Sequence, residues 1–159
     1  MVNFREKMLS FRHLCYKNGY LFAAFLIPVI LMGIAYISFG IYPFGGRSVL
    51  SLDLNAQYVF YFDYVHDVIG NGESLMYSWS RNLSGEFMGI IGYYLASPFN
   101  ILVWIFPRSM ITEGLLTMML AKFGACGVTF ALFAHKSQKL SKTTAALFAP
   151  MYALCAYMI

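Results

Sequence analysis

The sequence predicts an all-α membrane protein, built as a polytopic helical bundle. Of its 159 residues, 60% are hydrophobic and only 11% are charged, whereas about a quarter of the residues in a soluble domain carry charge. Uncharged runs long enough to cross a bilayer, which takes roughly 20 residues, recur along the chain. The formal net charge of +4 does not indicate a nucleic-acid partner, because the basic residues cluster beside apolar segments. Clusters in such places set membrane topology.

Three segments are expected to cross the membrane. The first, 20–39, is uncharged, and Pro28 within it is expected to bend the helix rather than end it. The second is 109–134, which contains two charged residues. The third, 143–159, stops without a polar flank. This ending indicates a chain cut short within a helix, or a piece of a much larger protein.

The uncharged segment 87–106 is also long enough to cross, and charge counting decides what it does. If it crosses, the basic residues outside the spans divide five against five. If it only dips into the membrane, seven lie inside (Arg5, Lys7, Arg12, Lys17, Lys136, Lys139, Lys142) and three outside (Arg47, Arg81, Arg108). The second count obeys the positive-inside rule. We therefore expect 1–19 and 135–142 in the cytoplasm and 40–108 outside as one loop, with 87–106 interfacial or re-entrant.

Residues 52–69 carry most of the available chemistry. At 100° per residue, apolar and polar side chains of this segment fall on two opposite arcs, and only Val59 and Phe60 break the pattern. Such a helix beside a membrane span is expected to lie in the interface with its carboxylates facing water. The apolar arc holds Leu54, Tyr58, Tyr61, Phe62, Val65, Val68 and Ile69, and the polar arc holds Asp53, Asn55, Gln57, Asp63, Tyr64, His66 and Asp67.

A series of motifs between residue 20 and about residue 135 resembles the start of the YfhO family of bacterial membrane proteins. In chain order these are Asp53-x-x-x-Gln57-Tyr58, Tyr-Ser-Trp at 77–79, Gly85, Tyr-Tyr-Leu-Ala-Ser-Pro-Phe-Asn at 93–100, and Phe-Pro at 106–107. The string at 93–100 is the most specific of them. Family members are several times longer than this chain. The resemblance therefore implies an N-terminal piece that is inactive alone.

The YfhO family in turn resembles GT-C glycosyltransferases. This resemblance implies a multi-pass protein of the bacterial cell membrane that moves a sugar from a polyprenyl-phosphate carrier to an extracellular cell-wall polymer such as teichoic acid. Its partners are then membrane lipid, the lipid-linked donor and the polymer acceptor. Asp53 falls where GT-C enzymes carry an acidic residue. Because it is a lone Asp rather than an Asp-x-Asp pair, a base role is favoured; no cofactor is required, although a divalent cation is possible. The alternative is a non-catalytic transporter or scaffold that binds polyprenyl lipids.

Sugar transfer of this kind requires a base near the acceptor hydroxyl and a group that stabilises the departing phosphate. Ser51 is expected to cap the helix and so place Asp53 in the first turn, where the helix dipole favours the ionised carboxylate. Gln57, one turn later, is then placed to bind a sugar hydroxyl, and Tyr58 of the same motif joins it as a substrate-binding residue. The alternative is that Asp53 only stabilises the start of the helix.

Two further sets of polar residues are ambiguous in the sequence. Asp63, His66 and Asp67 share one face at a spacing that suits a divalent ion, but a solvated face on an interfacial helix is the favoured interpretation. Trp79 and Arg81 lie together in a polar stretch and are expected to contact a sugar. The other aromatic residues of this region, Tyr77, Tyr93 and Tyr94, are assigned to the aromatic belt of the membrane surface.

Lys122 lies close to the middle of its predicted span. A charge at that depth costs at least ~2.5 kcal/mol unless it is paired or faces a wet cavity. Two interpretations follow. Lys122 either contacts the phosphate of the lipid carrier, or it forms a buried ion pair with a carboxylate.

Overall fold

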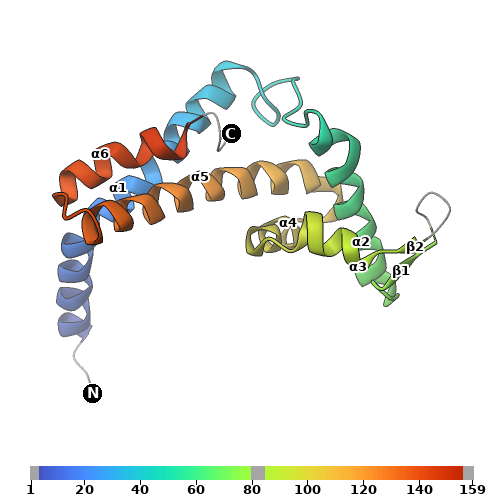
Figure 1. Ribbon diagram of the computed structural model, residues 1–159, viewed down its shortest axis with the longest axis horizontal. Helices are drawn as coiled ribbons and strands as arrows, with labels where there is room; N and C mark the ends of the chain where they lie inside the picture. Colours follow the sequence, from blue (N-terminus) through green and yellow to red (C-terminus); the bar gives the residue numbers. More distant parts are fainter. Residues whose placement is uncertain (1–3, 80–84, 156–159) are drawn as a thin grey trace. The chain divides into compact units, whose positions relative to one another are not determined.

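The computed structural model describes residues 4–79 and 85–155, with side chains from residue 18 onward. The fold is that of an all-α membrane protein, as predicted from composition (Figure 1). It contains two compact units. The first consists of Met1–Ala35 and Leu120–Ile159, and the second of Tyr36–Met119.

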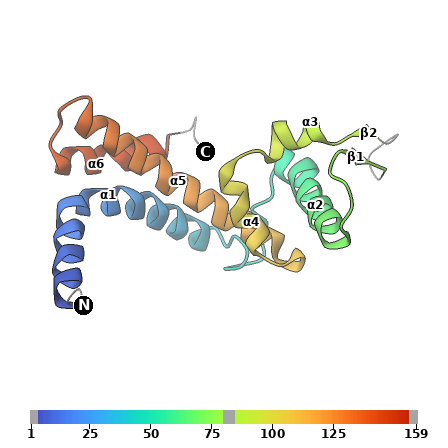
Figure 2. The same cartoon turned by 90° about the horizontal axis from the view of Figure 1, so that it is seen from below.

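The first unit is built from parts of three helices: α1 (Phe4–Ser38), α5 (Ile111–Lys136) and α6 (Lys142–Ala153). Small side chains let these helices lie side by side (Figure 2). Their buried core is made of alanines, namely Ala24, Ala131, Ala134, Ala145 and Ala149. Membrane helices are held together by close packing of this kind, because hydrophobicity alone does not distinguish a neighbouring helix from lipid.

The second unit consists of short elements around one aromatic core. Its helix α2 (Val59–Asn71) is preceded by a π-helical turn, Leu54–Tyr58. The remaining elements are β1 (Tyr77–Ser78), β2 (Gly85–Glu86), α3 (Met88–Ile90), a second π-helical turn (Ile91–Leu95), a 3₁₀ turn (Pro98–Asn100), α4 (Ile101–Ile105) and a 3₁₀ turn (Arg108–Met110). The strands form an antiparallel pair that the composition did not predict.

The amphipathic segment predicted at 52–69 forms the first π-helical turn and α2, which ends where Gly72 adopts a left-handed φ of 68°. Phe62, Val65 and Val68 of the apolar arc are buried in the core. Ile69 departs from the prediction, since it is 59% exposed near the end of the helix. Tyr64, assigned to the polar arc, packs against the buried Phe87 that follows β2.

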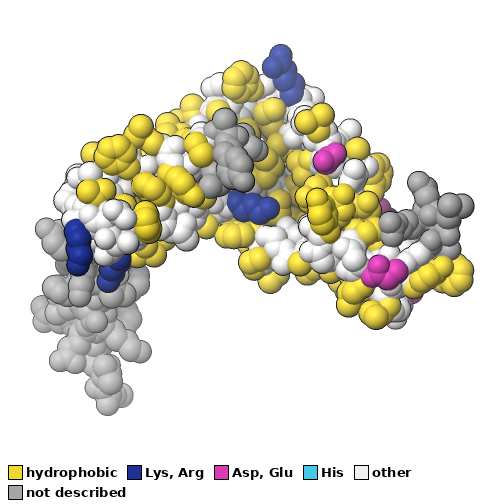
Figure 3. All heavy atoms as spheres, viewed as in Figure 1, with side chains coloured by type: hydrophobic (Ala, Val, Ile, Leu, Met, Phe, Trp, Pro, Cys, Tyr) yellow, Lys and Arg dark blue, Asp and Glu magenta, His cyan; other side chains and the backbone are white. Residues whose placement is uncertain are grey.

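Two helical stretches of the described chain are long and apolar enough to cross a membrane: Asn18–Ser38 and Arg108–Lys136, with mean hydropathy of 2.4 and 1.7. Met88–Leu95 and Pro98–Ile105 form a third candidate, bent by 93° as in a broken span or a re-entrant loop. The described part of the predicted third span forms α6, and residues 156–159 of that span lie outside the described residues. Hydrophobic side chains are spread widely over the described part of the face shown in Figure 3, with few charged ones among them, as expected for a surface in contact with lipid.

Candidate functional site

A cluster of aromatic rings holds the second unit together, and we call it the tyrosine cluster. Tyr58 and Tyr61 each contact Tyr94, with ring centroids 5.1 Å apart in both pairs. On the other side, Tyr64 meets Phe87 edge to face at 4.6 Å. Tyr58 and Tyr94 come from the two π-helical turns. Such turns are rare and are frequently found at functional sites.

Asp53 immediately precedes the first π-helical turn and is exposed. The predicted cap is wrong: neither Ser51 nor Asp53 makes a side-chain capping hydrogen bond in the described structure. Instead, Leu52 adopts a left-handed φ of 48°, and the carbonyls of Ser51 and Leu52 accept hydrogen bonds from the first amides. The Asp53 carboxylate interacts electrostatically with Tyr94. Its charge is therefore near enough to act on the tyrosine cluster, whose member Tyr58 follows Asp53 by five residues.

Further along α2, Asp63 and Asp67 both bind Arg108. The guanidinium donates through Nε and Nη2 to Asp63, the second bond being 2.7 Å long, and through Nη1 to Asp67. These hydrogen bonds hold the pKa of Asp63 below its ordinary value. The predicted solvated face is therefore only partly right, because both carboxylates stay half-exposed but share one cation.

The divalent-ion alternative for this face gains no support. No group of three His, Cys, Asp or Glu side chains suited to a metal ion occurs among the described residues. His66, the third member of the proposed set, has a buried Nε2 without a hydrogen-bond partner.

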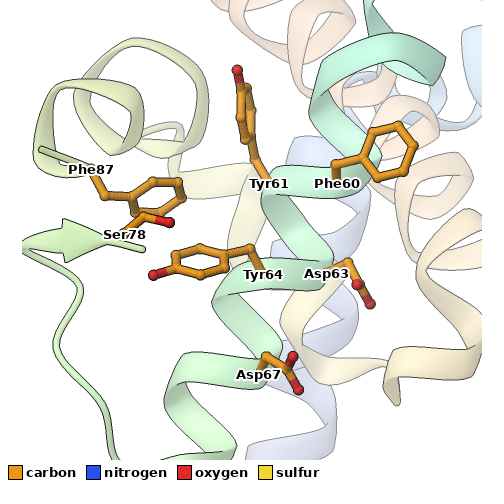
Figure 4. A pocket seen from close by; sticks show the side chains of 7 residues that line it. All are labelled: Phe60, Tyr61, Asp63, Tyr64, Asp67, Ser78 and Phe87. Atoms are coloured by element: carbon orange, nitrogen blue, oxygen red, sulfur yellow. The ribbon is translucent and has the colours of Figure 1, made fainter. Parts of the chain in front are cut away.

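A groove of about 300 Å³ crosses α2 between these features (Figure 4). Ser78 and Phe87 lie at one end, facing Tyr61 and Tyr64, and the carboxylates lie on the other flank of the helix. The groove is lined by Phe60, Tyr61, Asp63, Tyr64, Asp67, Ser78 and Phe87. We call it the α2 groove.

A second pocket of about 390 Å³ contains Trp79, which the sequence predicted as a sugar contact. Trp79 is 82% exposed, and its ring lies edge to face with Tyr77 at 4.9 Å. The other lining residues are Tyr64, Glu73 and Ser74. Arg81, its predicted companion, lies outside the described residues. Because Tyr64 lines both pockets, they are neighbours on α2.

Comparison with known proteins identifies the family. A family model described as the bacterial membrane protein YfhO matches residues 23–159. The chain belongs to the YfhO family. No curated protein and no solved structure matches it. Membership in YfhO, together with the long apolar helices, supports a membrane location.

The predicted site residues of this YfhO family member fall in separate places. Asp53, Gln57 and Tyr58 lie at the first π-helical turn, with Gln57 half-buried and Tyr58 in the tyrosine cluster. Trp79 lies in the second pocket. Lys122 belongs to the first unit, where its side chain is exposed on α5 and forms no ion pair with a described residue. Both interpretations of Lys122 therefore stay predictions.

Sequence reasoning missed two features of this YfhO site. Arg108 entered only the charge count, although it binds two carboxylates that are 45 and 41 residues away. The i, i+4 spacing of Asp63 and Asp67 is a usable signal for such a partner, because both side chains lie on one helix face. Ser78 and the α2 groove have no comparable signal, since the short hairpin that places them shows no periodicity.

Proposed function

We propose that this YfhO family member acts in membrane sugar transfer, moving a sugar from a polyprenyl-phosphate carrier to an extracellular cell-wall polymer such as teichoic acid, with Asp53 as the base. Membership in a family of bacterial membrane proteins supports the setting. The observation that carries the chemistry is an exposed carboxylate at the start of a helix that has no hydrogen-bond or ion-pair partner among the described residues and acts electrostatically on Tyr94.

The availability of the carboxylates singles out Asp53. Most described carboxylates are engaged: Asp63 and Asp67 by Arg108, Glu113 by the Tyr42 hydroxyl at 2.9 Å, and Glu86 by the Gly89 amide. Among the described residues, only Asp53 and Glu73 lack such a partner in the hydrogen bonds and ion pairs found. A general base must be free to reach the proton that it removes. Of these two, only Asp53 lies at the π-helical turn with Gln57 and Tyr58.

Neighbouring side chains supply what a sugar needs besides a base. Tyr58 and Tyr94 offer ring faces and edges, and the Gln57 amide offers both a donor and an acceptor to hydroxyl groups. Trp79 provides a second exposed ring for a sugar. Separately, in the first unit, Lys122 is proposed to contact a carrier phosphate, because an ammonium group that forms no ion pair with a described residue is suited to a phosphate ester.

The test is Asp53→Asn in the full-length protein, which keeps shape and polarity but removes the base. We expect transfer of labelled sugar from polyprenyl phosphate to polymer to fall by at least ~100-fold, the lower range for loss of a general base. Membrane insertion and melting temperature should stay unchanged. Glu113→Gln is the matched control, since it neutralises a carboxylate that lines neither of the two pockets and its amide oxygen can still accept the Tyr42 hydrogen bond, and it should keep near-normal transfer.

Equal, small losses in Asp53→Asn and Glu113→Gln would return Asp53 to a role in starting the helix. In that case the competing function, a lipid-binding transporter or scaffold, gains support if the purified protein still binds the polyprenyl phosphate. Asp63→Asn is a weaker probe, because it also breaks the ion pair with Arg108.

A further inference from the structure

We infer that the α2 groove is a binding subsite for a neutral sugar unit, separate from the Asp53 end of the helix. This inference rests on the proposed function, whose substrates are carbohydrates. The groove combines aromatic rings with hydroxyl and carboxylate oxygens in one cavity of about 300 Å³. Sugars require this combination, because their C–H faces pack on rings while their hydroxyl groups need hydrogen-bond partners.

Ser78 is the observation that indicates a ligand. The residue is only 2% exposed, and its hydroxyl opens onto the groove rather than being sealed from it, since the fully buried side-chain atom without a partner among the described residues is His66 Nε2. A hydroxyl that reaches a cavity in this way can donate a hydrogen bond to a bound molecule or accept one from it. In Figure 4 the Ser78 oxygen lies between the rings of Phe87 and Tyr64, directed into the groove. A sugar hydroxyl at this position would hydrogen-bond the Ser78 side chain.

The charge of the groove sets the class of ligand. Asp63 and Asp67 contribute two negative charges, and the one guanidinium that binds them leaves a net negative charge. A phosphate group is repelled there, whereas hydroxyl groups can donate to the free lone pairs of both carboxylates. The groove therefore suits a neutral glycosyl unit rather than the phosphate of a carrier lipid or of a polyol-phosphate chain.

The position of the groove separates it from the proposed base. Asp63 follows Asp53 by ten positions, which corresponds to about 15 Å along a helix at 1.5 Å per residue. At that separation the carboxylates of Asp53 and Asp63 cannot both contact the same atom of a substrate. The groove would therefore hold a part of the carbohydrate remote from the reacting hydroxyl, where binding energy orients the substrate.

The experiment measures binding, not transfer. Full-length protein is reconstituted in nanodiscs free of sugar-based detergents, and saturation-transfer NMR follows methyl glucoside and, separately, glycerol 3-phosphate. We expect methyl glucoside to bind and glycerol 3-phosphate not to. Ser78→Val and Tyr64→Leu should each weaken methyl glucoside binding by roughly tenfold, since each removes one direct contact. Tyr64→Phe, which keeps the ring, and Ser137→Val, an exposed serine of the first unit, should bind normally.

Several outcomes overturn the inference. Methyl glucoside binding that survives both Ser78→Val and Tyr64→Leu would place the sugar elsewhere, and stronger binding of glycerol 3-phosphate would refute the charge argument. Melting curves of each variant identify any loss caused by unfolding, and Tyr64→Leu covers the case in which Ser78→Val does not fold. Asp53→Asn separates the two proposals, because this variant should still bind methyl glucoside. Loss of transfer in a variant that still binds methyl glucoside would support both the Asp53 base and the sugar subsite. If Asp53→Asn leaves transfer unchanged, only the role of Asp53 as the base is refuted.

Discussion

Arg108 determines whether the charged face of α2 is a purely solvated surface or an ion-paired one. Two carboxylates one helical turn apart point to the same side of α2, and a single guanidinium bridges them with three donors. Without this cation, two like charges would repel at close range. The ion pair thus joins α2 to the segment that leads into α5, and it does so within the second unit.

The ion pair makes a prediction about pH. Arg108→Gln should lower the melting temperature at pH 7 by a few degrees, whereas Arg47→Gln, at an exposed arginine without an ion pair among the described residues, should not. Because the pKa of Asp63 is lowered below 3.8 in the folded protein, its stabilising contribution is complete above that value and is lost as the pH falls through the folded pKa. Thermal unfolding across acidic pH should therefore show the Arg108→Gln deficit vanishing. A deficit that persists undiminished at the lowest pH would assign it to packing.

At the scale of elements, periodicity predicted the amphipathic helix within about two residues at each end, because burial of one face dominates its pattern. It could not predict the π-helical turns. Five residues such as Leu54–Tyr58 fit an i→i+4 and an i→i+5 pattern equally well, and contacts far away in the chain select between them. The hairpin of β1 and β2 was not predicted for a related reason, because strands of two residues are too short to show alternating apolar and polar residues.

The packing of α1 on α5 supplies a prediction at the same scale. A Cβ atom added at Gly127 would lie 2.1 Å from the Ala24 carbonyl oxygen, so the two helices meet there without room for a methyl group. Gly127→Ala should therefore destabilise the helix pair by about 1–3 kcal/mol, the usual cost of overpacking. Gly33→Ala is the matched control, because nothing lies within 4 Å of its Cβ position. It should be neutral or slightly stabilising, since alanine favours helix over glycine. Melting temperatures in detergent compare the two, and equal values would show that α1 and α5 separate freely.

At the scale of the whole molecule, composition and uncharged runs were enough to predict an all-α membrane protein, because a bilayer permits few ways to satisfy the backbone. The YfhO motifs predicted the family, and the family model confirms it. The candidate site was less predictable. Asp53, Gln57 and Tyr58 share one turn and could be grouped from the sequence, whereas the α2 groove depends on a tertiary contact between α2 and a hairpin that no local pattern encodes.

Membrane topology is the property of the whole chain that charge counting predicts and that labelling can check. We expect Asn71→Cys, placed in a variant without Cys15, Cys126 and Cys155, to react in intact cells with an impermeant thiol reagent, and Ser137→Cys to stay unlabelled until the membrane is opened. Both positions are exposed on the protein, so access depends on the side of the membrane.

The pair of positions is diagnostic because the bent segment and α5 lie between them. The helix α5 has 26 residues, about 39 Å at 1.5 Å per residue, which is enough to cross a core of about 30 Å once. If Met88–Ile105 only dips into the bilayer, one crossing separates the two cysteines and only position 71 reacts. If that segment crosses, two crossings return the chain to its starting side and both positions react. Labelling of position 137 alone would instead place the N-terminus outside, against the count of seven basic residues to three.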